Sequence, residues 1–452
     1  MENQYYTKAT TLEEIDNAVR FDVPIGADHP FFTDFSEVRG DFEDRMIYRV
    51  LNVNPTKYTY NLKANQGNKT LLFLAGMRGS GKTSELAKIA QKIHNKEAFF
   101  CVTCNIDDGL DLNDMEYMDI LIFQLERLFE ELRDNQMIFE TPIVASLQKW
   151  FTERVEEANR VIKREGGFEL ELQAGTPKFL SFLSITSKIK ANLLGSKENA
   201  KKLRTVFKNN FREFALLTNN FIGEINMYLR NNDKAKEILF IVDGLEKTAS
   251  LDIRKKLIVE ESERIKQIKV NSIFTLPVEL MPEGRKLESF STLVSFPFVK
   301  IINKDGSIVE QAIKKFIEFT YKRIDKSLFD SEDTVRKAIM IGGGSPREYL
   351  RVLEYANYFI EEEKGVIDEM ALQKGIKKLA AQISHYISEE DLELLKLLRK
   401  NNEQQIDTPY GEKWHDLIEK LIILEYNDGT YKRVNPIVEE SNLYKQYVLE
   451  AE

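Results

Sequence analysis

The sequence predicts an α/β protein in which a parallel β-sheet is followed by a helical domain and a smaller C-terminal domain. Two observations support this prediction. Residues 70–75, 238–243 and 271–276 are short apolar runs of the kind that buried parallel strands show. The first run leads into a glycine-rich loop, and the apolar residues from Leu86 to Ile93 then follow the spacing of one helical face. We therefore expect a strand, a loop and a helix in succession at the start of the sheet.

The glycine-rich loop runs from Gly76 to Thr83 and matches the pattern G-x-x-x-x-G-K-[ST] of a phosphate-binding P-loop. Its glycines let backbone N–H groups converge on phosphate oxygens, and the N-terminus of the next helix adds partial positive charge. Lys82 is expected to reach the β- and γ-phosphates, and the Thr83 hydroxyl to ligate Mg²⁺. The sequence thus predicts a nucleoside triphosphate site, with ATP and Mg²⁺ as cofactors. The residues expected to hold the nucleotide are Gly76, Arg78, Gly79, Ser80, Gly81, Lys82, Thr83 and Ser84.

Polar residues also end the other two apolar runs. Asp243 closes the run 238–243, as in the Walker B pattern, where a carboxylate orders the hydration shell of Mg²⁺. Thr83 and Asp243 are therefore the expected metal site. Glu246 could polarise the attacking water or could equally be an exposed turn residue. Thr275 lies at the end of the run 271–276, where a polar residue faces the γ-phosphate in related folds, and it is a sensor candidate.

The core predicted for residues 69–303 contains an insertion at about 110–235. A further strand is expected at 98–106, and about 130 residues separate it from the run ending at Asp243, more than a crossover helix requires. Within the insertion, residues 168–172 alternate like a strand and could pair with 179–191. One helix, about 50 Å long at ~1.5 Å per residue, is then expected from 196 to 229.

Further elements are expected before the core and at its C-terminal end. Residues 1–68 are predicted to be an N-terminal lead-in or linker that contains a helix at 35–53. The last core strand is expected at 294–302, where Pro297 implies an edge strand or a bulge.

Two further domains follow the predicted core. Residues 304–385 are predicted to form a helical lid, in which Gly344-Ser345-Pro346-Arg347 starts a helix with Pro346 in the first turn. Residues 386–452 contain short helices followed by a hairpin at 424–434 with Asp-Gly at its turn. That order suggests a winged-helix-like domain.

The P-loop, then Asp243-Gly244-Leu245-Glu246, then the Gly-Ser-Pro-Arg element ending at Arg347 resemble the AAA+/STAND branch of P-loop ATPases over roughly residues 35–435. In layout the chain is similar to bacterial STAND-like ATPases and to origin-recognition ATPases. The resemblance implies an ASCE-type P-loop NTPase sheet with a helical lid, and an Arg347 that reaches the phosphates and reports nucleotide state. AAA+ proteins usually carry Glu directly after the Walker B Asp, where this chain has Gly244. Either Glu246 substitutes, or hydrolysis is slow and the protein is mainly a switch.

The function implied by this resemblance is an ATP-dependent molecular switch that controls self-assembly or partner binding, as in bacterial phage-defence or mobile-element systems. We expect a homo-oligomer and a protein effector or sensor partner. A neighbouring subunit's arginine commonly completes such sites, and Arg285 is one candidate for that role. The alternatives are a nucleotide-binding scaffold without turnover and a DNA-binding ATPase that acts through the winged helix and a basic stretch.

Charge is distributed unevenly along the chain. The net charge of −9 does not favour nucleic-acid binding by the molecule as a whole. Between residues 188 and 212, however, eight Lys or Arg residues accompany a single acid, Glu198. This stretch could be a solvated helix face or a patch for DNA phosphates. Its basic residues are Lys188, Lys190, Lys197, Lys201, Lys202, Arg204, Lys208 and Arg212.

The sequence also gives expectations about cellular location. No run approaches 18 apolar residues, the N-terminus lacks the pattern of a signal peptide, and the chain has two cysteines. We therefore expect a cytoplasmic protein that does not bind membranes.

Overall fold

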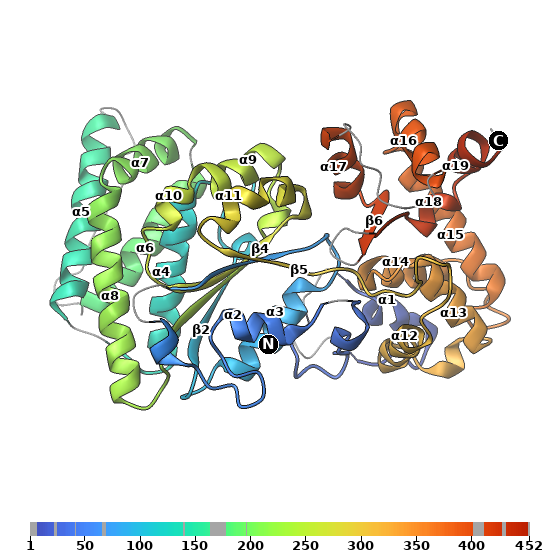
Figure 1. Cartoon of the computed structure of the whole chain (residues 1–452), viewed down its shortest axis with the longest axis horizontal. Helices are drawn as coiled ribbons and strands as arrows, with labels where there is room; N and C mark the ends of the chain where they lie inside the picture. The colour runs from blue at the N-terminus through green and yellow to red at the C-terminus, as the bar shows by residue number, and fades with distance from the viewer. Residues whose placement is uncertain are drawn as a thin grey trace.

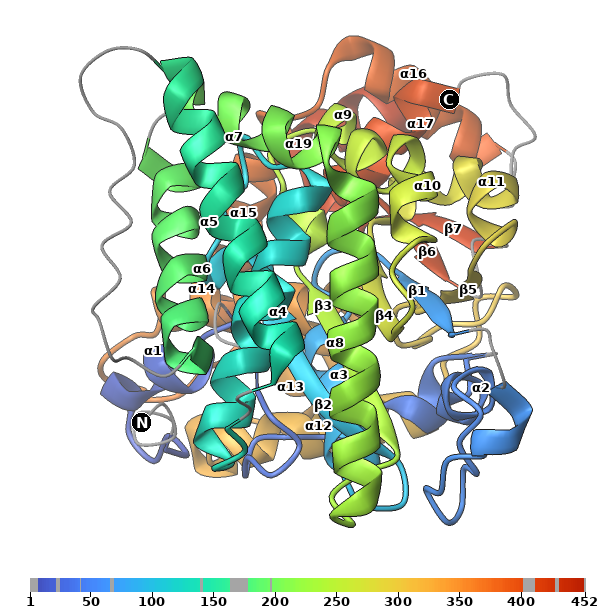
Figure 2. The ribbon, with the colours of Figure 1, turned by 90° about the vertical axis from the view of Figure 1, so that its left-hand side faces the viewer.

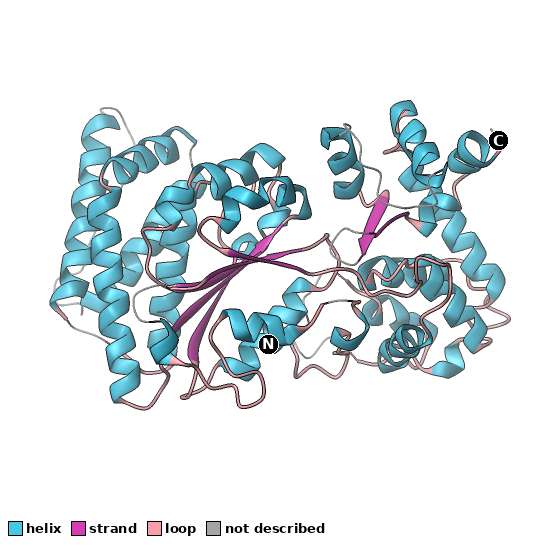
Figure 3. Ribbon diagram, in the orientation of Figure 1, coloured by secondary structure: helices cyan, strands magenta, loops and turns pink. Residues whose placement is uncertain are grey.

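The computed structural model describes residues 7–21, 25–40, 42–65, 69–138, 141–162, 178–195, 197–400, 411–426 and 431–450. Within these residues, a five-stranded sheet lies between a set of long helices and a set of shorter ones (Figures 1 and 3). Its strands are β1 (Leu71–Ala75), β2 (Phe99–Asn105), β3 (Glu237–Asp243), β4 (Asn271–Leu276) and β5 (Thr292–Ser295).

The strand order is β2-β3-β4-β1-β5, and all neighbouring strands are parallel. β4 thus lies between β1, which leads into the P-loop, and β3, which ends at Asp243. This order confirms the predicted ASCE-type P-loop NTPase fold. Because all strands run in one direction, the carboxyl ends of β1, β3 and β4 meet at one edge of the sheet, the usual position of a ligand site in such sheets.

Each face of the sheet packs against a different group of helices. Phe73, Phe240 and Phe274 point to the face that packs against the long helices of the insertion, which stand in front of the sheet in Figure 2. Leu72 and Leu239, one position along their strands, belong to a second apolar cluster on the opposite face. That face is covered by α2 (Asp44–Val50) and α3 (Lys82–Ile93). Both faces are buried, which explains why the strand sequences are continuously apolar.

The insertion consists of long helices in the described residues, and two predictions about it were wrong. Residues 179–191 lie in a helix and not in a hairpin, because their buried side chains recur at intervals of three or four residues. The proposed partner strand, 168–172, lies outside the described residues. The single helix predicted for 196–229 is interrupted at Asn210, whose side-chain amide donates to the Val206 carbonyl (2.8 Å). The helices are α4 (Tyr117–Asp134), α5 (Pro142–Ile162), α6 (Lys178–Gly195), α7 (Lys197–Asn209) and α8 (Phe211–Asn231).

The boundaries at both ends of the core differ from those predicted. β5 pairs with β1 over only Thr292–Ser295, because Pro297 lacks the N–H that a continuing strand needs. Its position at the edge of the sheet agrees with the edge alternative predicted for Pro297. The helix expected at 35–53 is limited to a short turn at Ser36–Val38 and to α2. Short helices follow β3 and β4: α9 (Leu251–Lys255), a π-helix (Lys256–Glu260), α10 (Ser262–Ile265) and α11 (Gly284–Glu288).

The residues after the core share one apolar cluster with the N-terminal segment. Ala9, Ile15 and Phe35 belong to the cluster that also holds the lid helices and the C-terminal hairpin. The turn of that hairpin lies outside the described residues, and its assignment to a winged helix stays a prediction. The elements are α1 (Ile15–Ala18), α12 (Glu310–Arg323), α13 (Glu332–Ile341), α14 (Pro346–Asn357), α15 (Glu369–Ser384), α16 (Glu389–Lys400), α17 (Gly411–Glu419), β6 (Ile423–Tyr426), β7 (Tyr431–Val434), α18 (Pro436–Glu439) and α19 (Asn442–Tyr444).

Across the described ranges, we find no helix that is both long enough and apolar enough to cross a membrane.

Candidate nucleotide site

The glycine-rich loop connects β1 to α3 at the carboxyl edge of the sheet. Gly79 and Gly81 have φ angles of +82° and +95°, which residues with a Cβ rarely adopt. Gly76 is required for space, since a Cβ there would lie 2.5 Å from the Phe296 carbonyl oxygen. Lys82 is the first residue of α3, and its Nζ donates to the carbonyl oxygens of Gly76 (2.8 Å) and Met77 (3.1 Å). The ammonium is therefore held over the loop, which places it where a phosphate chain would lie.

The predicted metal site joins the P-loop to the end of β3. The Thr83 hydroxyl donates to Asp243 Oδ2 (2.5 Å), although the two residues are 160 positions apart. Burial raises the pKa of Asp243, and the neighbouring Glu246 adds to this effect. A hydroxyl and a carboxylate are hard oxygen ligands, so the pair fits Mg²⁺, which takes its remaining ligands from phosphates and water.

Glu246 lies in the cavity beside the P-loop and is not an exposed turn residue. Its side chain is 11% exposed, and its Oε1 is 3.5 Å from Lys82 Nζ. Burial alone would raise its pKa, but the charge of Lys82, then a backbone hydrogen bond of Glu246 itself, and then the charge of Lys247 outweigh that effect and leave the pKa below the ordinary value. The carboxylate is thus ionised at neutral pH and can accept a proton or orient a water molecule.

Thr275 holds the turn that leads to Glu246. The Thr275 side chain is fully buried at the end of β4, and its Oγ1 accepts the N–H of Gly244 (3.0 Å). Gly244 itself has a φ of +99°, so the chain reverses sharply after Asp243. Thr275 therefore lies beside the Walker B turn, and its hydroxyl also contributes to the lowered pKa of Glu246.

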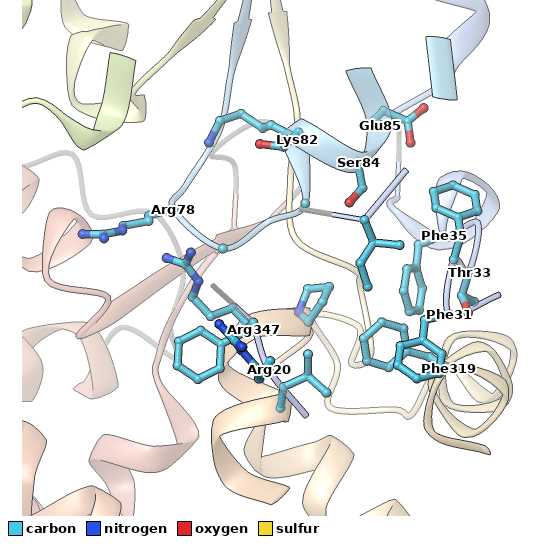
Figure 4. A pocket seen from close by; sticks show the side chains of 18 of the residues that line it. Arg20, Phe31, Thr33, Phe35, Arg78, Lys82, Ser84, Glu85, Phe319 and Arg347 are labelled. Atoms are coloured by element: carbon cyan, nitrogen blue, oxygen red, sulfur yellow. The ribbon is translucent and has the colours of Figure 1, made fainter. Parts of the chain in front are cut away.

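The start of α14 in the lid packs directly against the P-loop (Figure 4). A Cβ at Gly79 would lie 2.9 Å from the Cβ of Arg347. Burial lowers the pKa of Arg347, and the nearby Arg78 lowers it further. Within the part of the chain that the structure describes, neither arginine makes a hydrogen bond or an ion pair, whereas Arg347 lies over the ring of Phe21 (5.7 Å). Two closely spaced cations that form no ion pair among the described residues are electrostatically suited to an anion.

The N-terminal segment forms a wall of this cavity, which the sequence analysis did not predict. Arg39 is buried beneath the loop, and its guanidinium donates to the carbonyl oxygens of Ser80 and Pro297 (both 2.7 Å). Burial lowers the pKa of Arg39 to about 10. The only sequence signal for this wall was the apolar pair Phe31-Phe32 in an irregular region. The aromatic residues that line the cavity are Phe21, Phe31, Phe32, Phe35 and Phe319.

Most of the predicted site residues converge on one cavity. Ser80 and Thr275 are buried behind it, and Arg285 is exposed on α11 and is not among the residues that line it. Its proposed role toward a neighbouring subunit stays a prediction. The predicted residues that line the cavity are Arg78, Gly79, Gly81, Lys82, Thr83, Ser84, Glu246 and Arg347.

Comparison with known proteins finds a likeness in structure but none in sequence. No family model and no curated protein sequence matches the chain. Among solved structures, the chain is similar to the Walker-type ATPase PABY2304 of Pyrococcus abyssi, at 12% identity and a TM-score of 0.42, over 93% of this chain and 98% of that one. The fold is assigned from the strand order and from the geometry of the P-loop.

Proposed function

We propose that the chain binds ATP with Mg²⁺ in this cavity and hydrolyses it slowly, as a molecular switch. The observation that carries the proposal is the hydrogen bond between Thr83 and Asp243. It joins the P-loop to the acid at the end of β3, the two residues expected to hold Mg²⁺. Glu246 and Arg347, from the turn after β3 and from the lid, line the same cavity.

The proposed hydrolysis uses a rearrangement of Lys82. In the structure Lys82 is paired with Glu246 and with loop carbonyls. When its ammonium turns to the β- and γ-phosphates, the carboxylate of Glu246 is released to orient a water molecule and accept its proton. Bound Mg²⁺ would supply neutralisation of the phosphate charge. Gly244 and Leu245 separate Asp243 from this acid, whereas the usual catalytic Glu follows the Asp directly, and we therefore expect turnover to be slow.

The proposed switch function depends on the lid helix α14, which carries Arg347. Arg347 and Arg78 would contact a triphosphate more strongly than a diphosphate, so ATP would hold α14 against the P-loop and hydrolysis would loosen it. We propose that this change controls self-assembly or the binding of a protein effector or sensor, in a bacterial phage-defence or mobile-element system in the cytoplasm. These last steps are supported by the resemblance to STAND ATPases alone.

One second candidate has support from a specific residue. Gly244 occupies the position of the usual catalytic Glu, which favours a scaffold that binds nucleotide without turnover. A DNA-binding ATPase is less well supported, because several basic residues of the stretch 188–212 pair with acids of this chain.

Phosphate release from MgATP tests the proposal. We expect wild-type turnover, none from Lys82→Ala, and turnover at least about tenfold slower from Glu246→Gln, since general-base groups contribute ~10²–10⁴-fold. Glu246→Gln should bind ATP normally in a calorimetric titration. Wild-type binding without phosphate release would favour the scaffold, and an unchanged rate in Glu246→Gln would contradict the role of Glu246. Measuring the particle mass with and without a non-hydrolysable ATP analogue then tests nucleotide-dependent assembly.

A further inference from the structure

Arg254 is a buried cation that binds the turn carrying Glu246. It lies on α9, and the residue is 5% exposed. Its Nη2 donates to the carbonyl oxygens of Thr248 (2.8 Å) and Glu246 (3.3 Å), and its Nε donates to the Thr248 hydroxyl oxygen (3.2 Å). That hydroxyl in turn donates to the Leu245 carbonyl (3.0 Å). The backbone of the turn Leu245–Lys247 is thus fixed from one side by a single guanidinium.

The third nitrogen of the same guanidinium, Nη1, contacts two carboxylates from different parts of the chain. Nη1 is 2.8 Å from Glu419, on α17 of the C-terminal domain, and 3.5 Å from Glu279, in the segment that follows β4. Glu279 is buried, while the Glu419 side chain is 38% exposed. In Figures 1 and 2, α17 stands beside α9. Arg254 therefore connects the turn of Glu246 with the C-terminal domain.

The C-terminal hairpin touches the same site at two more places. The N–H of Glu425 donates to the Met77 sulfur in the P-loop (3.2 Å), and the Tyr426 hydroxyl donates to the carbonyl of Gly343, just before the lid helix α14 (2.5 Å). The domain that supplies Glu419 thus contacts the P-loop and the lid as well as the Walker B turn. If the C-terminal domain moved away from the P-loop, Arg254 would lose its contact to Glu419, the shorter of its two contacts to carboxylates.

We propose that Arg254 is a positioning residue for Glu246, and that Glu419 holds Arg254 in place, so that turnover depends on docking of the C-terminal domain. The inference rests on the proposed function, because it concerns hydrolysis at that site. With Glu419 removed, the guanidinium keeps its hydrogen bonds to the turn, but among the described residues its only remaining carboxylate contact is the longer one to Glu279 (3.5 Å), so its position is less firmly held. A shift of about 1 Å in a positioned group can cost ~10²-fold in rate, so a partial loss of position has a measurable effect.

The first experiment compares two neutral replacements on α17. Glu419→Gln should lower kcat for MgATP by at least about threefold and leave KM nearly unchanged, since the nucleotide contacts remain. Asp416→Asn is the matched control, because Asp416 lies on the same helix and pairs only with the exposed Lys420 (2.6 Å) among the ion pairs of the described residues. Both positions are partly exposed on α17, so folding is expected to survive. Arg254→Lys keeps the charge but cannot form the same fork of hydrogen bonds, and should lower kcat further.

The second experiment separates positioning from general stability. If Glu419 acts through Glu246, then Glu419→Gln should have no further effect on turnover in a Glu246→Gln background. An equal fold-loss in both backgrounds would overturn the inference, as would a kcat of Glu419→Gln equal to that of Asp416→Asn. Failure of the proposed function looks different: the wild type itself would then release no phosphate, or Lys82→Ala would release as much as the wild type. Either of those results would also overturn the role assigned to Arg254.

Discussion

Basic side chains occur in two regions of the molecule with opposite surroundings. In the nucleotide cavity, Arg78 and Arg347 have no ion-pair partner within the described ranges. In the insertion, Lys190, Arg204 and Lys208 are held by carboxylates of α4 or of the residue that precedes it. The sequence alone suggests that the anion site is in the insertion, because its densest run of positive charge is there. The comparison teaches that an anion site is marked by cations without a counter-charge, and that this property is visible only in three dimensions.

The ion pairs of the insertion are parts of its core. Asp119 and Glu126 are 2% and 1% exposed, so their carboxylates depend on the basic residues for neutralisation. The basic stretch therefore serves in part to attach α6 and α7 to α4. The pairs are Lys190 with Glu126 (2.7 Å), Arg204 with Asp119 (2.8 Å) and Lys208 with Glu116 (2.5 Å).

The largest effect is expected in the cavity, from Lys82→Ala. Removing the cation at the β- and γ-phosphates should abolish ATP binding, whereas Lys92→Ala, on the same helix but near its end, should leave the affinity unchanged. Isothermal titration with MgATP measures both. An affinity of Lys82→Ala close to that of the wild type would show that the cavity is not the nucleotide site.

In the insertion, Arg204→Ala should affect stability and not ligand binding. It leaves the buried Asp119 carboxylate without its guanidinium, at a cost of about 3 kcal/mol in the free energy of unfolding. Lys201→Ala, at an exposed position of the same helix, should change that free energy by less than about 0.5 kcal/mol. Denaturant titration distinguishes the two. Equal stability of both variants would mean that the ion pair does not support the insertion.

A smaller effect is expected from Arg347→Ala. A hydrogen bond to a charged group is worth about 1.5–3 kcal/mol, so the affinity for ATP should fall by about tenfold or more, and the affinity for ADP by less. Arg351→Ala is the control, because Arg351 is one turn further along α14 and pairs with Glu348 (3.0 Å). If the ATP and ADP affinities of Arg347→Ala fall equally, the lid arginine does not report the γ-phosphate.

The sequence predicted the elements whose signals are local. The P-loop, the Walker B strand ending at Asp243 and the start of α14 at Pro346 each depend on a few consecutive residues, and the structure has them at the predicted positions. The secondary structure of the insertion was harder to predict from the sequence. Residues 179–191 were expected to pair as a strand with the alternating run 168–172, whereas their burial follows a helical period.

Residues that act across long distances in the chain gave no signal. Arg39 contacts Ser80 and Pro297, and Arg254 contacts Glu419, but nothing in their immediate neighbours distinguishes them from surface arginines. The two uses predicted for Glu246 could not be separated from sequence either. Its burial beside Lys82 depends on how the turn after β3 is held, and that is decided by Thr275 and Arg254.

The smallest effect is expected for DNA. If four residues of the stretch 188–212 contacted duplex phosphates, affinity would fall roughly a hundredfold between 50 and 200 mM salt, since each contact adds about 0.9 to the slope of log K against log salt. We expect no such slope, because the ion pairs to Glu126, Asp119 and Glu116 already occupy part of the stretch and the net charge of −9 repels DNA at long range.

Fluorescence anisotropy with a labelled duplex at the two salt concentrations measures this. The informative variant replaces Lys197, Lys201 and Arg212 with Ala, because these side chains are exposed and replacing them leaves the buried ion pairs intact. Steep, salt-dependent binding by the wild type that flattens in this variant would establish the stretch as a phosphate site and would break the contrast between the two regions. Equal, weak binding by both proteins would show that the exposed basic residues of the stretch do not form a phosphate site, and the contrast between the two regions would stand.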